Sequence, residues 1–161
     1  MALIPNATNM QRGVVGTWAN MEEDNARTMF AASEFAAAVP LMKGTSEMQA
    51  APLTTGNRFI GIALRTVDMQ GAPTTDGEAT FKAGDLLGVA DMGTVFVLAG
   101  TDVTEGAVPF YDPATRKYHG ASDTGLLPLN GCEFDESAAD GAPVALRIRL
   151  VPGLAPVTAV S

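Results

Sequence analysis

The stretch Phe81–Gly100, FKAGDLLGVADMGTVFVLAG, decides the fold that we predict. Two short apolar runs, Leu86–Ala90 and Thr94–Leu98, flank Asp91-Met92-Gly93, and a short glycine-containing link between β-prone runs is typical of a hairpin. The second run contains four consecutive apolar residues, Val95, Phe96, Val97 and Leu98. Because successive side chains of a strand point to opposite faces, we expect both faces of this strand to be covered, by the rest of a sandwich or barrel or by another subunit.

Further strands are predicted on both sides of this stretch. Arg58–Arg65 is β-like, and Gly61 in its middle indicates a bulge or a close backbone approach. The turn chemistry of Asp112-Pro113-Ala114-Thr115 predicts a hairpin that joins the short runs Ala107–Tyr111 and Arg116–His119. Met69–Glu78 is expected to be a loop. The clearest alternation lies in Val144–Val151, as expected for a half-buried antiparallel strand.

The first 56 residues are harder to interpret and are treated as an N-terminal arm and linker, with a β-rich domain over residues 57–161. Residues 1 to about 25 lack a periodic apolar pattern, so we expect an arm that becomes ordered on a partner. Residues 26–42 are alanine-rich, which favours a helix, whereas a strand over Phe35–Met42 is the alternative. Residues 43–57 are rich in turn-forming residues and are expected to be loop. The apolar arm residues expected to contact a partner are Ile4, Met10, Val14, Val15, Trp18 and Met21.

Composition limits the classes of function. The 161 residues carry a formal net charge of −8, and 17% are charged against 47% that are hydrophobic. The average soluble domain has about 25% charged residues, so this chain is expected to hide apolar surface in an assembly. The ten Lys and Arg residues are scattered, which argues against nucleic-acid binding. A single cysteine fits a reducing compartment, and no signal peptide or membrane-spanning run is expected.

No residue pattern predicts catalysis. His119 is the only histidine and Cys132 the only cysteine. A lone histidine cannot complete a zinc site, and neither residue is accompanied by a recognisable nucleophile motif. We therefore expect no catalytic, metal or cofactor site, with His119 as an ordinary surface residue and Cys132 as a small buried apolar one.

The order of motifs from Asn57 onward resembles the structural cement proteins of tailed bacteriophage capsids. A Phe-Ile/Val-Gly-Ile/Val-Ala strand is matched by Phe59–Ala63, and a Gly-Asp-hydrophobic strand by Gly84–Val89. Later matches are Gly93–Val97, Asp102–Tyr111 and the closing pair of Cys132–Asp135 and Leu146–Leu150. The family's extended strand before the core would fall on Phe35–Met42, with Ala36 where a glycine often stands, and this favours strand over helix there.

The resemblance implies a mainly β protein, a small antiparallel β-barrel or β-sandwich with an extended N-terminal arm. It also implies a non-enzymatic protein that is made in the bacterial host cytoplasm and decorates the outer surface of the virion. Its partners would be the major capsid protein, which it would bridge and stabilise, and itself, as a dimer or trimer. Self-association is expected at Val95, Phe96, Val97 and Leu98.

A β-rich ligand-binding module, of the carbohydrate-binding type, is the alternative function. Such a module needs exposed aromatic residues beside polar groups. The aromatic residues available for that role are Phe110, Tyr111 and Tyr118.

Overall fold

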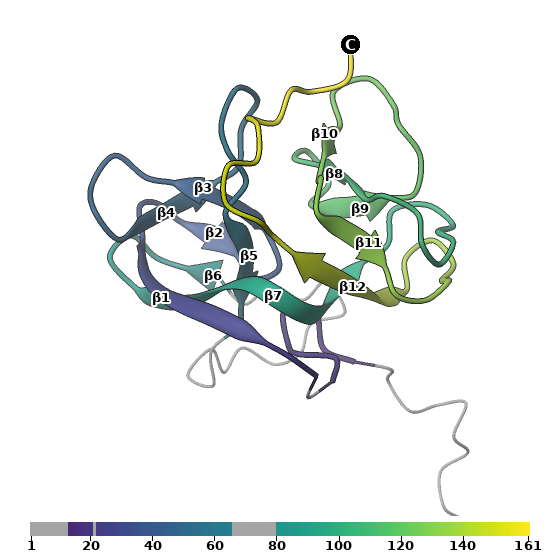
Figure 1. Ribbon diagram of the computed structural model, residues 1–161, viewed down its shortest axis with the longest axis horizontal. Helices are drawn as coiled ribbons and strands as arrows, with labels where there is room; N and C mark the ends of the chain where they lie inside the picture. The colour runs from purple at the N-terminus through teal and green to yellow at the C-terminus, as the bar shows by residue number, and fades with distance from the viewer. Residues whose placement is uncertain (1–12, 21, 66–79) are drawn as a thin grey trace, which may run out of the picture.

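The structure is a computed structural model that describes residues 13–20, 22–65 and 80–161 (Figure 1). Among these residues all regular structure is β, with no helix, which confirms the predicted class. The strands are β1 Asn25–Ala31, β2 Phe35–Ala36, β3 Pro40–Lys43, β4 Gln49–Pro52, β5 Gly61–Leu64, β6 Thr80–Phe81, β7 Leu86–Leu98, β8 Phe110–Asp112, β9 Lys117–His119, β10 Leu127–Pro128, β11 Cys132–Phe134 and β12 Pro143–Arg149.

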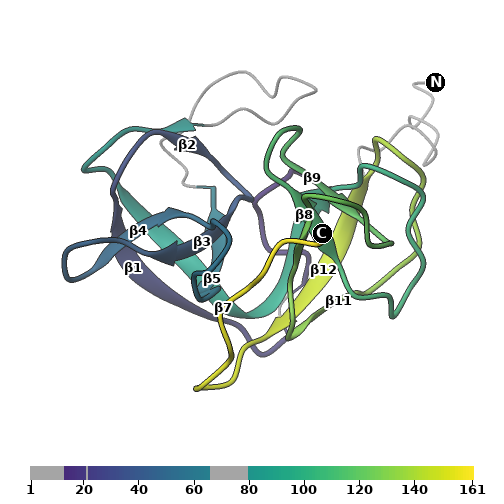
Figure 2. The same cartoon turned by 90° about the horizontal axis from the view of Figure 1, so that it is seen from above.

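Five strands close a small barrel in the order β1-β4-β3-β5-β7, with β7 pairing back onto β1 (Figure 2). Neighbouring strands are antiparallel except β1 and β4, which are parallel. The barrel, one of the two architectures predicted, is thus confirmed, but its strand directions are mixed rather than purely antiparallel. Gly61 makes the predicted close approach, because a Cβ atom there would lie 2.4 Å from the carbonyl oxygen of Ala90.

The long strand β7 joins the barrel to a second group of strands. Its first half, up to Met92, pairs with β1 and β5, and its second half pairs with β12, which in turn pairs with β11. The strands β10, β8 and β9 form a separate small sheet on this side. Figure 2 shows β7 curving from the barrel into this second group. The predicted hairpin at Asp91-Met92-Gly93 is therefore wrong, since the strand runs through these residues without a turn.

The N-terminal part of the chain contributes more to the sheet than the sequence indicated. Residues 26–42 form strands, which decides against the helix, and β4 lies inside the segment predicted to be loop. The division proposed at residue 57 does not coincide with a boundary of the sheet, because β1, β3 and β4 belong to the same barrel as β5 and β7. The hydrogen-bonded ring of the barrel, a long-range arrangement, outweighs the helix propensity of alanine here. The loop predicted at Met69–Glu78 lies outside the described residues.

Predictions based on local patterns succeeded elsewhere. The hairpin of β8 and β9 pairs Phe110 with His119 around the predicted turn. In that turn the Asp112 carboxylate accepts hydrogen bonds from the Ala114 amide at 2.9 Å and the Thr115 hydroxyl at 2.7 Å. Burial is the largest single influence on the pKa of Asp112 and raises it, but these hydrogen bonds, together with the Thr115 amide and the nearby His119, outweigh burial and lower the pKa below its usual value. In β12, Val144, Leu146 and Ile148 are fully buried, as the alternation predicted.

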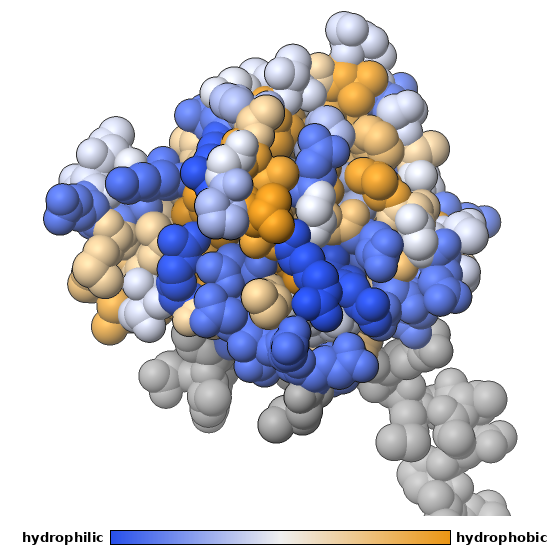
Figure 3. Space-filling view, viewed as in Figure 1, coloured by the Kyte–Doolittle hydropathy of each residue, from blue (hydrophilic) through white to orange (hydrophobic). Residues whose placement is uncertain are grey.

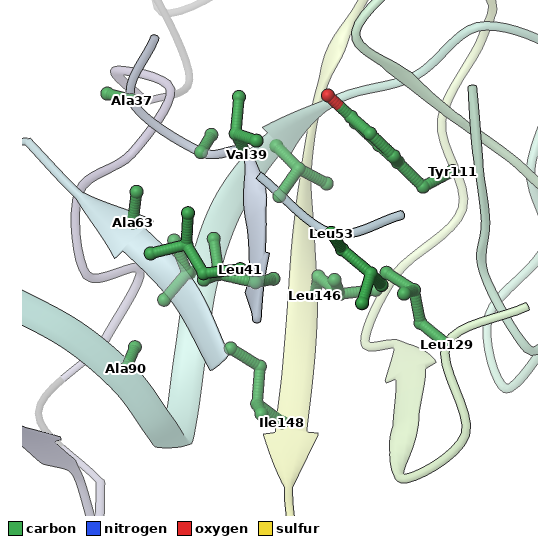
Figure 4. Packing of buried hydrophobic residues seen from close by; sticks show 14 of the residues in the cluster. Ala37, Val39, Leu41, Leu53, Ala63, Ala90, Tyr111, Leu129, Leu146 and Ile148 are labelled. Atoms are coloured by element: carbon green, nitrogen blue, oxygen red, sulfur yellow. The ribbon is translucent and has the colours of Figure 1, made fainter. Parts of the chain in front are cut away.

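One continuous core joins the barrel to the second group of strands. Figure 4 shows Leu53, Leu129 and Leu146 pointing toward one another, from the segment after β4, the segment before β11, and β12. A polar link crosses the same region, because the buried Tyr118 hydroxyl of β9 donates a hydrogen bond to the backbone carbonyl of Ala38. Ala38 has a φ of +63°, a left-handed conformation that is unusual for alanine. Burial raises the pKa of Tyr118 well above its usual value, so the hydroxyl remains a donor at neutral pH.

We predict that Tyr118→Phe lowers the free energy of unfolding by about 1–3 kcal/mol, because the buried Ala38 carbonyl loses its partner without any change in side-chain packing. Chemical denaturation at pH 7 measures this loss. Phe110→Leu, a change at a half-buried ring in the same hairpin, is the control and should cost less. A melting temperature unchanged by Tyr118→Phe would show that the hydrogen bond contributes nothing.

The same tyrosine makes stability depend on alkaline pH. An exposed tyrosine has a pKa of about 10, so the unfolded chain ionises above that pH whereas folded Tyr118, with its raised pKa, does not. The stabilisation is therefore complete below about pH 10 and is lost as the pH rises further. Denaturation of wild type between about pH 8 and pH 11 should show this decline, and Tyr118→Phe should show a shallower one.

Candidate functional site

Exposed apolar side chains gather where β1 ends and β7 begins. Phe30, Met48 and Leu86 are 40%, 55% and 57% exposed. Phe30 lies opposite Leu86 across the β1–β7 pair, and its amide donates to the Met48 carbonyl at 2.7 Å. In Figure 3 apolar residues lie among hydrophilic ones at the left edge of the molecule, on the β1 side of the barrel, whereas hydrophilic residues dominate over β7 and the end of β12. These three residues form the apolar patch, which presents a rigid, sheet-based surface for contact with another molecule.

A hollow of about 550 Å³ adjoins the apolar patch and shares Met48 with it. We call it the β1 hollow; its lining residues are Arg27, Thr28, Met29, Lys43, Met48 and Ile60. Its apolar residues come from β1, from the β3–β4 connection and from the segment just before β5. The Arg27 guanidinium spans part of it, 3.2 Å from the Asp91 carboxylate and 3.5 Å from the Ile60 carbonyl. An open apolar hollow of this size with a few charged groups suits a protruding side chain or a short chain segment.

A second hollow, of about 300 Å³, has a different chemistry. Its lining includes Glu133, Arg147 and Arg149 on β11 and β12. Arg147 lies 2.7 Å from Asp135 and 3.9 Å from Glu22, and Arg149 lies 3.4 Å from Glu23. These pairs hold the acidic residues before β1 against the outer face of β12, although exposed ion pairs of this kind stabilise a protein by about 1 kcal/mol at most.

Part of the predicted arm belongs to the folded domain. Ile4, Met10 and Met21 lie outside the described residues, whereas Val14, Val15 and Trp18 lie within them and are half-buried. The segment from Gly16 to Ala19 runs beside β7, with the Gly16 amide donating to the Phe96 carbonyl at 2.8 Å and the Ala19 amide to the Thr94 carbonyl at 2.7 Å. Val15 and Trp18 pack against the core. The expectation of an arm with no fixed place on its own domain is therefore wrong for residues 13–20.

Gly93 explains where Trp18 lies. The tryptophan ring crosses this glycine so closely that a Cβ atom there would lie 2.5 Å from the ring carbon Cζ3, and Gly93 has a φ of +120°. Trp18 thus packs on its own domain, and the expected contact with a partner, through its remaining exposed edge, stays a prediction.

Only part of the predicted self-association surface is accessible in the structure. Val95 and Val97 are fully buried inside the chain, so the expectation that they lie at a subunit interface is wrong. Phe96 and Leu98 point to the other face of β7 and are half-buried. The Phe96 ring lies against Gly13, where a Cβ atom would be 2.4 Å away. Val95 and Val97 are thus covered by the protein's own core, and Phe96 is covered in part by the N-terminal segment.

The residues considered for chemistry have structural roles. Cys132 is buried, and that burial raises the pKa of its thiol, which is unsuited to a nucleophile. His119 Nε2 lies 4.0 Å from the Asp112 carboxylate and has no hydrogen-bond partner within the described part of the chain. Across the described ranges, no cluster of three or more His, Cys, Asp or Glu residues is placed to hold a metal ion. The described residues also contain no helix long and apolar enough to cross a membrane.

The aromatic platform proposed for carbohydrate binding is not available. Tyr111 and Tyr118 are only 3% and 0% exposed, with ring centres 5.1 Å apart inside the core. Burial raises the pKa of Tyr111 as well. A sugar could reach neither ring, and Phe110 alone is half-buried.

Sequence analysis missed the apolar patch. Phe30 lies in the alanine-rich segment, Met48 in the predicted loop, and Leu86 in a run expected to be core. The one available signal was Met48, a large apolar residue among turn-forming neighbours. The other two residues become neighbours only when β1 pairs with β7.

One family model and two solved bacteriophage structures are similar to the chain. The family model described as structural cement protein (E217 gp24/Pam3 gp6) matches residues 4–149. Among solved structures, the chain is similar to one described as the capsid of Myoviridae phage XM1, with a TM-score of 0.70 and 14% identity over 92% of this chain and 98% of that one. It also resembles the head fiber gp8.5 N base of bacteriophage phi29, with a TM-score of 0.50 and 17% identity over 80% of this chain and 99% of the other. The comparison with curated proteins gave no significant match.

We predict that Gly93→Ala destabilises the protein by about 1–3 kcal/mol, because the added methyl group overlaps the Trp18 ring. Gly84→Ala is the matched control. Gly84 also has a positive φ, +88°, but no neighbouring atom lies within 4 Å of the position that a Cβ atom would take, so this variant reports backbone strain alone. Equilibrium denaturation of both variants, and of Gly93→Ala combined with Trp18→Ala, measures the overlap. If the losses in the free energy of unfolding caused by Gly93→Ala and by Trp18→Ala simply added in the double variant, that result would contradict the contact between Gly93 and the Trp18 ring.

Proposed function

The chain belongs to the phage structural cement protein family, and from that premise we propose that it binds the outer face of the assembled capsid and bridges neighbouring major capsid subunits. As a member of this family it is a non-enzymatic component of the phage virion capsid. The match over residues 4–149 is the observation that carries the proposal. The similarity to the capsid structure of phage XM1 supports it at the level of the fold.

The apolar patch and the β1 hollow supply a surface suited to that role. Full burial of a large apolar side chain contributes roughly 1.5–3 kcal/mol, so covering Phe30, Met48 and Leu86 offers a modest gain for each copy. A cement protein that contacts two shell subunits at once gains further, because the second contact forms at a high effective concentration. Many such bridges around a shell would resist the separation of its subunits.

The charge of the chain favours the exterior of the capsid. A net charge of −8 repels the phosphate backbone of packaged DNA, which attracts basic proteins. The proposed site is therefore the outer surface of the virion, after synthesis in the host cytoplasm.

The remaining arm and self-association residues complete the proposal. Ile4 and Met10 would contact the capsid, as would Met21, while Val14, Val15 and Trp18 first serve the protein's own domain. Dimers or trimers would form on the capsid through Phe96 and Leu98, the two residues of the predicted surface that are partly exposed.

The test is a binding and stability experiment on capsids that lack the protein. Purified protein should sediment with mature capsids and raise the temperature at which they break open, because subunits that share a bridge must separate together. Serum albumin, an acidic protein of unrelated fold, is the control. Failure to sediment with the capsids would overturn the proposal, and binding without any gain in capsid stability would overturn the bridging role.

Two truncations separate the arm from the domain. Removing residues 1–12 should weaken capsid binding and leave the melting temperature nearly unchanged, since the N-terminal segment lacks the periodic apolar pattern of an element that packs on its own domain. Removing residues 1–20 should also lower the melting temperature, because it deletes the hydrogen bonds of Gly16 and Ala19 to β7. Capsid titration beside a thermal melt distinguishes the two effects. Full capsid binding by the shorter truncation would show that the first twelve residues are not an anchor.

A further inference from the structure

One edge of β1 is unpaired over most of its length. Residues Asn25–Met29 pair with β7 on one side, whereas the pairing with β4 begins only at Phe30. The Phe30 amide points away from β7, toward the Met48 carbonyl. Because backbone groups alternate in direction along an antiparallel strand, the peptide groups of Thr28 and Ala26 also point away from β7. Within the described ranges no strand accepts them, so this edge can receive an added strand.

The β1 hollow lies directly beside this open edge. Thr28 and Met29 of β1 form one wall, and Ile60 lies across from them. A strand added next to β1 would direct alternate side chains to one face, where the hollow offers apolar lining. An unpaired backbone edge next to a side-chain pocket is the combination by which proteins recognise extended peptide segments.

Met48 extends an exposed apolar side chain from the hairpin connection between β3 and β4. It is 55% exposed and has a φ of +55°, in the left-handed region that is costly for most residues other than glycine. The hairpin turn thus fixes the position of this side chain at the β1 hollow, where it can contact an occupant.

The charged groups of the β1 hollow favour an occupant that carries a negative charge. Its two charged lining residues, Arg27 and Lys43, are both basic in a chain whose net charge is −8. Arg27 already lies beside Asp91, whereas Lys43 has no ion pair with any described residue. An acidic side chain placed near Lys43 would complement it.

We propose that the open edge of β1 and the β1 hollow bind an extended segment of the capsid shell protein, which adds as a strand beside β1, places apolar side chains in the hollow and presents an acidic side chain to Lys43. This inference rests on the proposed function, since it names the surface by which the cement protein grips the shell. A second copy of this chain fits the site less well. Two β1 edges paired about a two-fold axis would bring the Arg27 and Lys43 side chains of both copies to one interface, where like charges oppose association.

The test uses the full-length protein and mature capsids in a sedimentation titration. Met48→Asn removes the apolar side chain but keeps a residue that tolerates a left-handed conformation, so the melting temperature should stay the same or rise while capsid affinity falls about tenfold. Lys43→Glu should also weaken binding about tenfold, and Lys43→Gln should weaken it less. Val151→Asn is the matched control, because Val151 is an equally exposed apolar residue, 59%, outside the hollow, and it should bind like wild type.

Hydrogen exchange identifies the added strand. The amides of Ala26 and Thr28 should exchange more slowly on capsids than in the free protein, because they would acquire backbone partners. If the wild-type protein binds capsids, two results would overturn this inference and leave the proposed function intact. One is an unchanged capsid affinity in both Met48→Asn and Lys43→Glu. The other is an unchanged exchange rate of the Ala26 and Thr28 amides on capsids. Absence of wild-type binding would overturn both. Self-association of the free protein that Met48→Asn abolishes would assign the site to a second copy and contradict the inference.

Discussion

The structure depends on the continuity of β7, which supplies hydrogen bonds to two groups of strands at once. Its first half completes the barrel between β1 and β5, and its second half carries β12 on one edge and the segment around Trp18 on the other. No other described strand belongs to both groups, so β7 alone joins them by strand pairing. Gly93 lies near the middle of β7, and the Trp18 ring packs directly over it in an apolar contact.

The contacts between the two groups of strands leave the apolar patch on the barrel exposed, so it is available for binding another protein. The long-range contacts through Tyr118 and the leucine cluster of Figure 4 anchor the second group of strands against the barrel. The apolar patch of Phe30, Met48 and Leu86 instead lies on the barrel, near the end of β1 and the start of β7. A surface built on paired strands loses little conformational entropy when it binds, which suits a protein whose proposed role is to hold other subunits in place.

Sequence patterns predicted the features whose causes are local. The alternation of Val144, Leu146 and Ile148 and the side-chain hydrogen bonds of Asp112 depend on neighbours in sequence, and both were found. The turn expected at Asp91-Met92-Gly93 was wrong because its glycine is required by a residue far away in the sequence, Trp18. Likewise β1 and the apolar patch come from barrel closure, which brings Phe30, Met48 and Leu86 together from three segments. Motif order still identified the family, since that depends on the succession of strands along the chain rather than on their pairing.

A reconstruction of capsids decorated with this protein would show where it binds and which subunits it contacts. The account predicts density for the barrel on the outer surface, in contact with at least two major capsid subunits, with the apolar patch and the open edge of β1 turned toward the shell. Density inside the shell, or a protein that touches a single subunit through the β8–β9 side, would contradict it.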